Sequence, residues 1–259
     1  MPIGLKVAMV EETPDGRMKR LITGQFQKAL PRRFYKIVEV SANNAVLLDG
    51  RSIKTPLKAT LALPTLALAS AVAAEWAAQV DVINPTTMPL TKLANTAIDR
   101  ATSERQVILS EIVDYAGTDL VCYLATTPET LVQKQKHHWV PVLDWARNQL
   151  GVEFAVAHGI SHVAQTPDAI AAYRLHISAL SAWRLTGVYV LTTLTGSALL
   201  SAMLEKNAIS AVNAWAATHV DEDFQIAHWG EDEEAKARRS GRHLEFEGLV
   251  HYLELLSKN

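Results

Sequence analysis

A change of hydrophobic periodicity near Pro64 is the feature of this sequence that most constrains its fold. Three short segments rich in β-forming residues precede it, at residues 34–40, 45–48 and 51–55. The last two are separated by Asp49-Gly50, a strong signal for a β-hairpin. After Pro64 the apolar residues recur mainly at helical spacing. We therefore predict an α+β fold, with an antiparallel β-rich part followed by a larger helical part.

The first predicted helix begins after Pro64, whose missing N–H is tolerated at a helix start. Its apolar stripe is expected at Leu66, Ala69, Ala73, Trp76, Ala77 and Val80. Glu75 and Gln79 lie off that stripe. The sequence therefore predicts a single helix that closes the β-rich part.

Two proline-containing pairs, Asn84-Pro85 and Met88-Pro89, fix the path of the chain after this helix. We place a domain boundary there. The expected organisation is an N-terminal segment at 1–32 that is free to be flexible, a β-rich domain with one helix at 33–85, and an α-helical domain at 86–259.

The stretch from Leu185 to Leu204 carries no formal charge and is long enough to cross a bilayer. Threonine, serine and glycine residues dilute its apolar content. We therefore expect a buried helix, or two helices broken near Gly196, and no stable insertion into a membrane.

Composition excludes several classes of protein. The 25 Lys and Arg residues nearly balance the 27 Asp and Glu residues, so no global field would hold nucleic acid. A single cysteine excludes a disulfide scaffold and suits a reducing cytoplasm. The glycine-rich phosphate-binding motifs, the GxSxG nucleophile motif and the HExxH zinc motif are all absent from the sequence.

The remaining candidates for chemistry are weak. His158 and His162 have a spacing that could face a metal, but Gly159 lies between them and the nearest downstream acid is Asp168. Cys122 lies in an apolar run, which favours an inert thiol. We expect no catalytic residue, no metal and no cofactor.

Charge is unevenly distributed along the chain. Residues 17–36 are basic, whereas acidic residues concentrate around Trp229-Gly230, between Asp221 and Glu234. The acids can compensate the dipole of a helix N-terminus, or they can form a recognition edge for a basic partner. From the residues alone, a protein-binding or assembly factor and an enzyme with a scattered, unrecognised acidic active site both stay open.

Several strings, in order along the chain, resemble one known family. They are Leu48-Asp49-Gly50-Arg51, Lys54-Thr55-Pro56, Glu75-Trp76-Ala77-Ala78-Gln79, residues 85–99, Thr118-Asp119-Leu120, Trp139-Val140-Pro141, Asp221-Glu222-Asp223-Phe224-Gln225 and Trp229-Gly230-Glu231-Asp232. Together they resemble the assembly chaperones of the F-type ATP synthase catalytic head, of the kind specific for the alpha subunit.

The resemblance implies a chaperone without enzymatic activity that binds the unassembled alpha subunit and prevents its aggregation until the beta subunit replaces it. It also implies a β-rich domain followed by an orthogonal helical bundle. A bacterial form working in the cytoplasm is expected, while eukaryotic relatives work in the mitochondrial matrix. A free client-binding surface favours a monomer. A general holdase or scaffold is the alternative.

The resemblance also suggests site residues. Acidic residues near the Trp-Gly pair matter in the family, and here they point to Glu231 and Glu234. The neighbouring candidates for partner binding are Asp232, Trp229, Asp221 and Asp223. A structural role is expected for Pro85, Met88, Pro89, Asn95, Asp99, Asp119 and Trp139.

Arg51 and Lys54, on the predicted hairpin, are further candidates for partner binding. They could meet an anionic surface, or they could be ordinary exposed charges of an edge strand.

Overall fold

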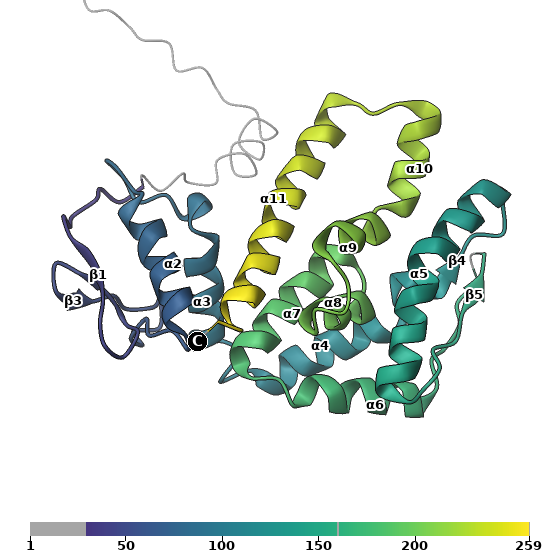
Figure 1. Ribbon diagram of the computed structural model, residues 1–259, viewed down its shortest axis with the longest axis horizontal. Helices are drawn as coiled ribbons and strands as arrows, with labels where there is room; N and C mark the ends of the chain where they lie inside the picture. The colour runs from purple at the N-terminus through teal and green to yellow at the C-terminus, as the bar shows by residue number, and fades with distance from the viewer. Residues whose placement is uncertain (1–29, 160, 259) are drawn as a thin grey trace, which may run out of the picture.

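The chain folds into a small sheet-and-helix unit beside a larger set of helices, from which α10 and α11 project as an arm (Figure 1). This computed structural model describes residues 30–159 and 161–258. The α+β class, with its antiparallel β-rich start and its helical remainder, is confirmed. Most of the segment predicted at 1–32 lies outside the described residues.

Three strands form an antiparallel meander in the order β1-β2-β3. They are β1 (Val38–Val40), β2 (Val46–Leu48) and β3 (Arg51–Ser52). The turn between β2 and β3 has positive φ at Asp49 (48°) and Gly50 (77°), which is the backbone that an Asp-Gly hairpin favours. Leu48 pairs with Arg51 across it, so the predicted hairpin is confirmed.

The rest of the described chain is mostly helical. Its elements are α2 (Leu66–Ala77), η1 (Pro85–Thr87), α3 (Pro89–Asp99), α4 (Arg105–Gly117), η2 (Leu120–Cys122), β4 (Tyr123–Leu124), α5 (Glu129–Leu150), β5 (Ala157–His158), α6 (Pro167–Ser178), α7 (Ala182–Thr195), α8 (Ala198–Glu205), α9 (Ala211–Thr218), α10 (Val220–Trp229) and α11 (Glu233–Leu255). Strands β4 and β5 pair in parallel. Side-chain oxygens cap several helix N-termini by accepting a backbone N–H, at Thr65, Thr166, Ser181, Ser197, Ser210 and Asp232.

Helix α2 buries a face that matches the predicted stripe only in part. Leu68, Ala69 and Val72 are buried, and Ala73 and Trp76 pack half-buried against the core. Leu66 is exposed, as is Val80, which lies beyond the end of the helix. The helix is so rich in alanine that its own pattern selects a face only weakly. Contacts with β1 and α3 decide which face is covered.

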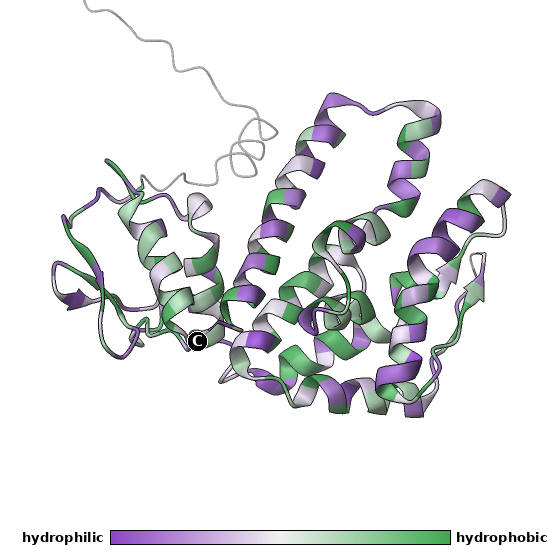
Figure 2. Cartoon of the chain, viewed as in Figure 1, coloured by the Kyte–Doolittle hydropathy of each residue, from purple (hydrophilic) through white to green (hydrophobic). Residues whose placement is uncertain are grey.

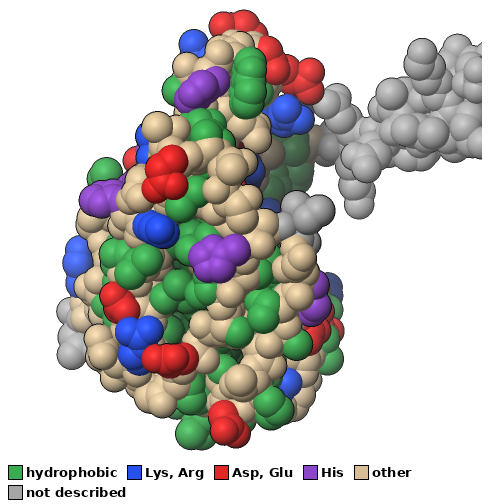
Figure 3. Space-filling model, turned by 90° about the vertical axis from the view of Figure 1, so that its right-hand side faces the viewer, with side chains coloured by type: hydrophobic (Ala, Val, Ile, Leu, Met, Phe, Trp, Pro, Cys, Tyr) green, Lys and Arg blue, Asp and Glu red, His purple; other side chains and the backbone are tan. Residues whose placement is uncertain are grey.

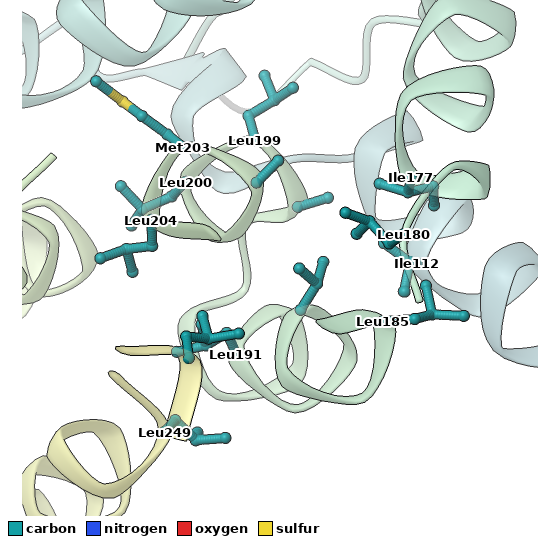
Figure 4. Packing of buried hydrophobic residues seen from close by; sticks show 14 of the residues in the cluster. Ile112, Ile177, Leu180, Leu185, Leu191, Leu199, Leu200, Met203, Leu204 and Leu249 are labelled. Carbon is teal, nitrogen blue, oxygen red and sulfur yellow. The ribbon is translucent and has the colours of Figure 1, made fainter. Parts of the chain in front are cut away.

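The uncharged stretch forms the centre of the fold as two helices. Gly196, with φ of 72°, ends α7, and α8 begins two residues later, so the predicted break is confirmed. Helix α7 packs against α3, α4, α8 and α11. Leucines of α7 and α8 meet those of neighbouring helices in the core (Figure 4), and both helices carry mostly hydrophobic residues (Figure 2).

None of the helices in residues 30–159 and 161–258 has the length and apolarity needed to cross a bilayer.

Buried residues of α2, such as Leu68, belong to the same apolar cluster as those of α7, such as Leu185. The domain boundary near residue 85 stays a prediction.

Glu75, on α2, caps the start of α3 from a distance in sequence. Its Oε1 accepts from the backbone N–H of Leu90 at 2.7 Å. Its Oε2 accepts from the backbone N–H and the hydroxyl of Thr91, at 2.8 and 2.7 Å. Burial raises the pKa of this carboxyl above its ordinary value, while the hydrogen bonds oppose the rise. The side chain of Glu75 therefore fixes the start of α3 to α2.

Replacing Glu75 by alanine is expected to lower the free energy of unfolding by about 2 to 3 kcal/mol, because partly buried N–H donors lose their acceptor. Urea denaturation followed by circular dichroism measures the change. Glu75→Gln keeps one acceptor oxygen and is the matched control, with a smaller expected loss. Equal stability of the wild type and the alanine variant would contradict the capping role.

Candidate functional site

The connection between α10 and α11 forms the outer end of the arm (Figure 1). Helix α10 ends at Trp229, and Gly230 reverses the chain with φ of 83°. The Oδ1 of Asp232 then accepts from the N–H of Ala235 at 2.7 Å and caps α11. Because they are adjacent in sequence and this cap fixes the turn, the acidic residues 231–234 lie together at the exposed end of the arm. We call this group the acidic tip.

The carboxylates of the first turn of α10 are engaged within the protein. Asp221 Oδ1 accepts from Gln135 Nε2 of α5 at 2.6 Å. Asp223 pairs with Arg239 of α11, and Glu222 lies 3.8 Å from the same guanidinium. These contacts tie α10 to α5 and α11, so Asp221 and Asp223 hold the arm together before any partner binds.

The outer acids are placed differently. Glu231 and Glu234 are exposed, and neither forms an ion pair with another described residue. Glu234 lies in the first turn of α11, where its negative charge interacts favourably with the positive end of the helix dipole. That local role leaves both carboxylates accessible, so dipole compensation and recognition of a basic surface are compatible. Figure 3 shows acidic side chains gathered at the top of the molecule, at the level of this turn in Figure 1.

An apolar groove of about 430 Å³ adjoins the acidic tip. Its walls come from the segment after η2, the start of α5 and the length of α10, and include Tyr123, Leu124, Pro128, Leu131, Phe224 and Trp229. Trp229 is 77% exposed, which is unusual for so large an apolar side chain. Gln135 bridges the walls, since its Oε1 also accepts from the N–H of Ala125 at 2.6 Å. The groove places apolar area beside negative charge.

The sequence pointed to Trp229 but missed the rest of this groove. Tyr123 and Pro128 are about a hundred positions away from Trp229, and no local pattern indicates that they meet it. The one available signal is Trp229 itself, a large apolar residue that stays exposed on its helix.

Arg51 and Lys54 do not join this site. They lie in the N-terminal unit, at the other end of the molecule from α10 (Figure 1). Arg51 is exposed on β3, and Lys54 Nζ donates to Thr60 Oγ1 at 2.8 Å. The candidate partner-binding residues therefore fall into two separate groups.

The proline-rich connection packs closely against the sheet. Pro85 begins η1, and Pro89 occupies the first turn of α3, where its missing N–H does no harm. Met88, between them, is buried in a small apolar cluster with Tyr35, Leu48 and Ile83.

Asp99 links α3 to the turn after the sheet. Its Oδ1 accepts from Thr55 Oγ1 at 2.6 Å, and its Oδ2 accepts from the N–H of Leu57 at 3.0 Å. Asn95, one turn earlier, is half-buried. Asp119 and Trp139 are both buried in the helical part and hydrogen-bond across elements.

The groups considered for chemistry are not assembled into a reactive centre in the described part of the chain. Cys122 is buried, and burial raises the pKa of its thiol far above the ordinary value. His162 Nδ1 lies 3.0 Å from the hydroxyl of Tyr123. Residues 30–159 and 161–258 contain no group of three His, Cys, Asp or Glu side chains that could hold a metal ion.

Comparison with known proteins gives a consistent result. The family model described as the ATP12 chaperone protein matches residues 32–147. The mitochondrial protein atp12 of Schizosaccharomyces pombe is 28% identical over 222 residues, which cover 79% of this chain and 75% of that protein.

Solved structures extend the similarity over nearly the whole fold. The crystal structure of Atp12 from Paracoccus denitrificans is 38% identical, with a TM-score of 0.81, and covers 87% of this chain and 98% of that one. The Atu1473 protein from Agrobacterium tumefaciens is 40% identical, with a TM-score of 0.82, and covers 94% of this chain and 92% of that one.

Proposed function

The chain belongs to the ATP12 chaperone family, and we propose that its client is the unassembled alpha subunit of the F-type ATP synthase. It is a chaperone rather than an enzyme. Family membership is the single observation that carries the proposal. The resemblance of residues 85–99 and of the Trp229-Gly230 region to alpha-specific assembly chaperones supports the choice of subunit.

The physical task of such a chaperone is to cover an apolar surface temporarily. An interface that is permanent in the assembled enzyme is large and apolar, and it aggregates if it stays exposed. The chaperone binds this surface of the alpha subunit and leaves when the beta subunit takes its place. Binding must therefore be specific without becoming irreversible.

We propose that the acidic tip and the neighbouring groove contact the client. The carboxylates of Glu231 and Glu234, which pair with no cation among the described residues, attract a basic surface and orient the encounter. Trp229 and the groove beside it offer apolar area, and exposed tryptophan is a frequent anchor of interfaces. Asp221 and Asp223 support this surface by holding α10 to α5 and α11.

The proposed place of action is the bacterial cytoplasm, with the protein working as a monomer. The similarity to two bacterial proteins and the single, buried cysteine support the cytoplasm. The need for a free client-binding surface supports the monomer.

Co-expression with the isolated alpha subunit tests the proposal. We expect a soluble one-to-one complex with the wild-type chain, and none with the beta subunit as the client. The double variant Glu231→Lys, Glu234→Lys should bind the alpha subunit at least about tenfold more weakly, because attraction becomes repulsion.

The matched control is Asp114→Lys, Glu245→Lys, which makes the same change in charge at exposed positions away from the tip. It should bind like the wild type. Circular dichroism and the melting temperature confirm that each variant is folded. Full binding by the tip variant would refute the site, and equal binding of alpha and beta subunits would refute the choice of client.

A further inference from the structure

The N-terminal unit contains a hollow of about 570 Å³ between the sheet and α2. Its lining includes Phe34, Tyr35, Asp49, Arg51, Lys54 and Trp76. We call it the aromatic hollow. It lies in the part of the molecule farthest from the acidic tip, and Arg51 and Lys54, which do not reach the tip, both line it.

Aromatic rings form an apolar wall of the hollow. The Phe34 and Tyr35 rings meet edge to face, with centroids 5.4 Å apart, and Tyr35 packs against Trp76 at 5.8 Å. Phe34, which is 73% exposed, opens this wall to solvent. An exposed aromatic side chain at a concave site is typical of a surface that a partner covers.

The charge at the hollow is predominantly positive. Arg51 forms no ion pair with another described residue, and Lys54 donates only to the neutral hydroxyl of Thr60. The single acid of the lining, Asp49, is turned to the backbone: its Oδ1 accepts from the N–H of Ile37 at 2.8 Å and from that of Lys36 at 3.0 Å. Those hydrogen bonds lower the pKa of Asp49, so it stays a carboxylate, but among the described residues it forms no ion pair with Arg51 or Lys54.

Trp76 contributes a further unsatisfied group. Its indole Nε1 is buried and has no hydrogen-bond acceptor among the described residues, although the side chain lines the hollow. A buried donor without an acceptor is costly, and the indole is part of the wall that a bound segment would cover.

We propose that the aromatic hollow is a second docking site, which takes an extended client segment carrying an aromatic or aliphatic side chain flanked by Asp or Glu. The apolar side chain packs against Phe34 and Trp76, while the flanking carboxylates meet Arg51 and Lys54. This inference rests on the proposed chaperone function. The client is then held at two ends of the chaperone by opposite charges, basic at the hollow and acidic at the tip.

Opposite charges at two sites have a physical consequence for selectivity. A client must present a basic surface and an acidic, apolar segment at the matching separation, so a protein with only one of them binds more weakly. Each site alone can be of modest affinity, which allows the client to be released stepwise.

A short peptide of alternating phenylalanine and aspartate, blocked at both ends, tests the hollow without the client. Binding is followed by the ¹⁵N–¹H signal of the Trp76 indole, which is assigned with Trp76→Phe. We expect a saturable change in this signal for the wild type and for Glu231→Lys, Glu234→Lys. Affinity should fall about tenfold in Arg51→Glu, Lys54→Glu. A control peptide with lysine in place of aspartate should leave the signal unchanged.

An unchanged signal with the acidic peptide, equal binding by the Arg51→Glu, Lys54→Glu variant, or equal binding of the lysine peptide would overturn the proposal. So would self-association of the chain through the hollow, detected by sedimentation and abolished in the same variant. With the alpha subunit itself, this variant should bind about tenfold more weakly than the wild type. If the wild type fails to bind the alpha subunit, the proposed client is wrong, whereas the peptide result still decides the hollow.

Discussion

Replacing Asp119 by alanine is expected to lower the free energy of unfolding by about 4 kcal/mol, because two buried backbone donors lose their only charged acceptor. The carboxylate is 0% exposed. Its Oδ1 accepts from the N–H of Val121 at 3.2 Å, and its Oδ2 accepts from the N–H of Leu199 at 2.9 Å. One side chain thus caps η2 and the start of α8 together. Urea denaturation measures the loss.

Asp119→Asn is the matched control, since it keeps the shape and one acceptor oxygen and should lose less stability. The pH dependence gives an independent measurement. Burial raises the pKa of Asp119 in the folded protein to about 6, from an ordinary value of 3.8. Between these values the folded state holds a proton that the unfolded state has released, so this group's contribution to stability falls as the pH rises from about 4 to about 6.

The difference in stability between the wild type and Asp119→Asn should therefore shrink as the pH rises through this window. A difference that grows with pH would mean that the hydrogen bonds outweigh burial and that the folded pKa is lowered. Wild-type stability of the alanine variant would show that Asp119 is not needed for the packing of α8.

Replacing Trp139 by alanine is expected to cost about 4 kcal/mol of stability. Trp139 is 1% exposed and is the largest fully buried side chain among the described residues. Its indole Nε1 donates to the carbonyl oxygen of Ala217 at 2.8 Å, which joins α5 to α9. The variant leaves a large cavity and an unsatisfied carbonyl.

Trp139→Phe separates the two contributions, because it retains most of the apolar volume and removes only the N–H donor. We expect it to cost about 1 to 2 kcal/mol. Thermal unfolding followed by circular dichroism gives both values. A phenylalanine variant as unstable as the alanine variant would place the stabilisation in the hydrogen bond rather than in packing.

Features that depend on a few adjacent residues could be predicted from the sequence. The Asp49-Gly50 pair adopts the positive φ values of a hairpin, and Gly196 divides the uncharged stretch into α7 and α8. Both depend on backbone conformations that few residue types adopt, so the residue type alone carries the information. The chaperone family was likewise identifiable from strings of residues, and the comparisons confirm it.

Features that join distant segments could not be predicted in this way. The buried face of α2 was predicted only in part because alanine fits either side of a helix. Glu75 lies off the predicted apolar stripe of that helix, yet it caps α3. Tyr123 and Pro128 complete a groove with Trp229 only because α5 and α10 pack together.

The candidate site also has local features that the sequence predicts and long-range features that it does not. The sequence by itself determined that acids cluster around Trp229 and that Arg51 and Lys54 are basic hairpin residues. Only the tertiary structure decided that Asp221 and Asp223 are held internally while Glu231 and Glu234 pair with no other described residue, and that the two basic residues line a separate hollow. The physical reason is that the role of a charged side chain depends on the groups around it. Here those groups belong to α5, α11 and the sheet, which are too far away along the chain for a local sequence pattern to reveal them.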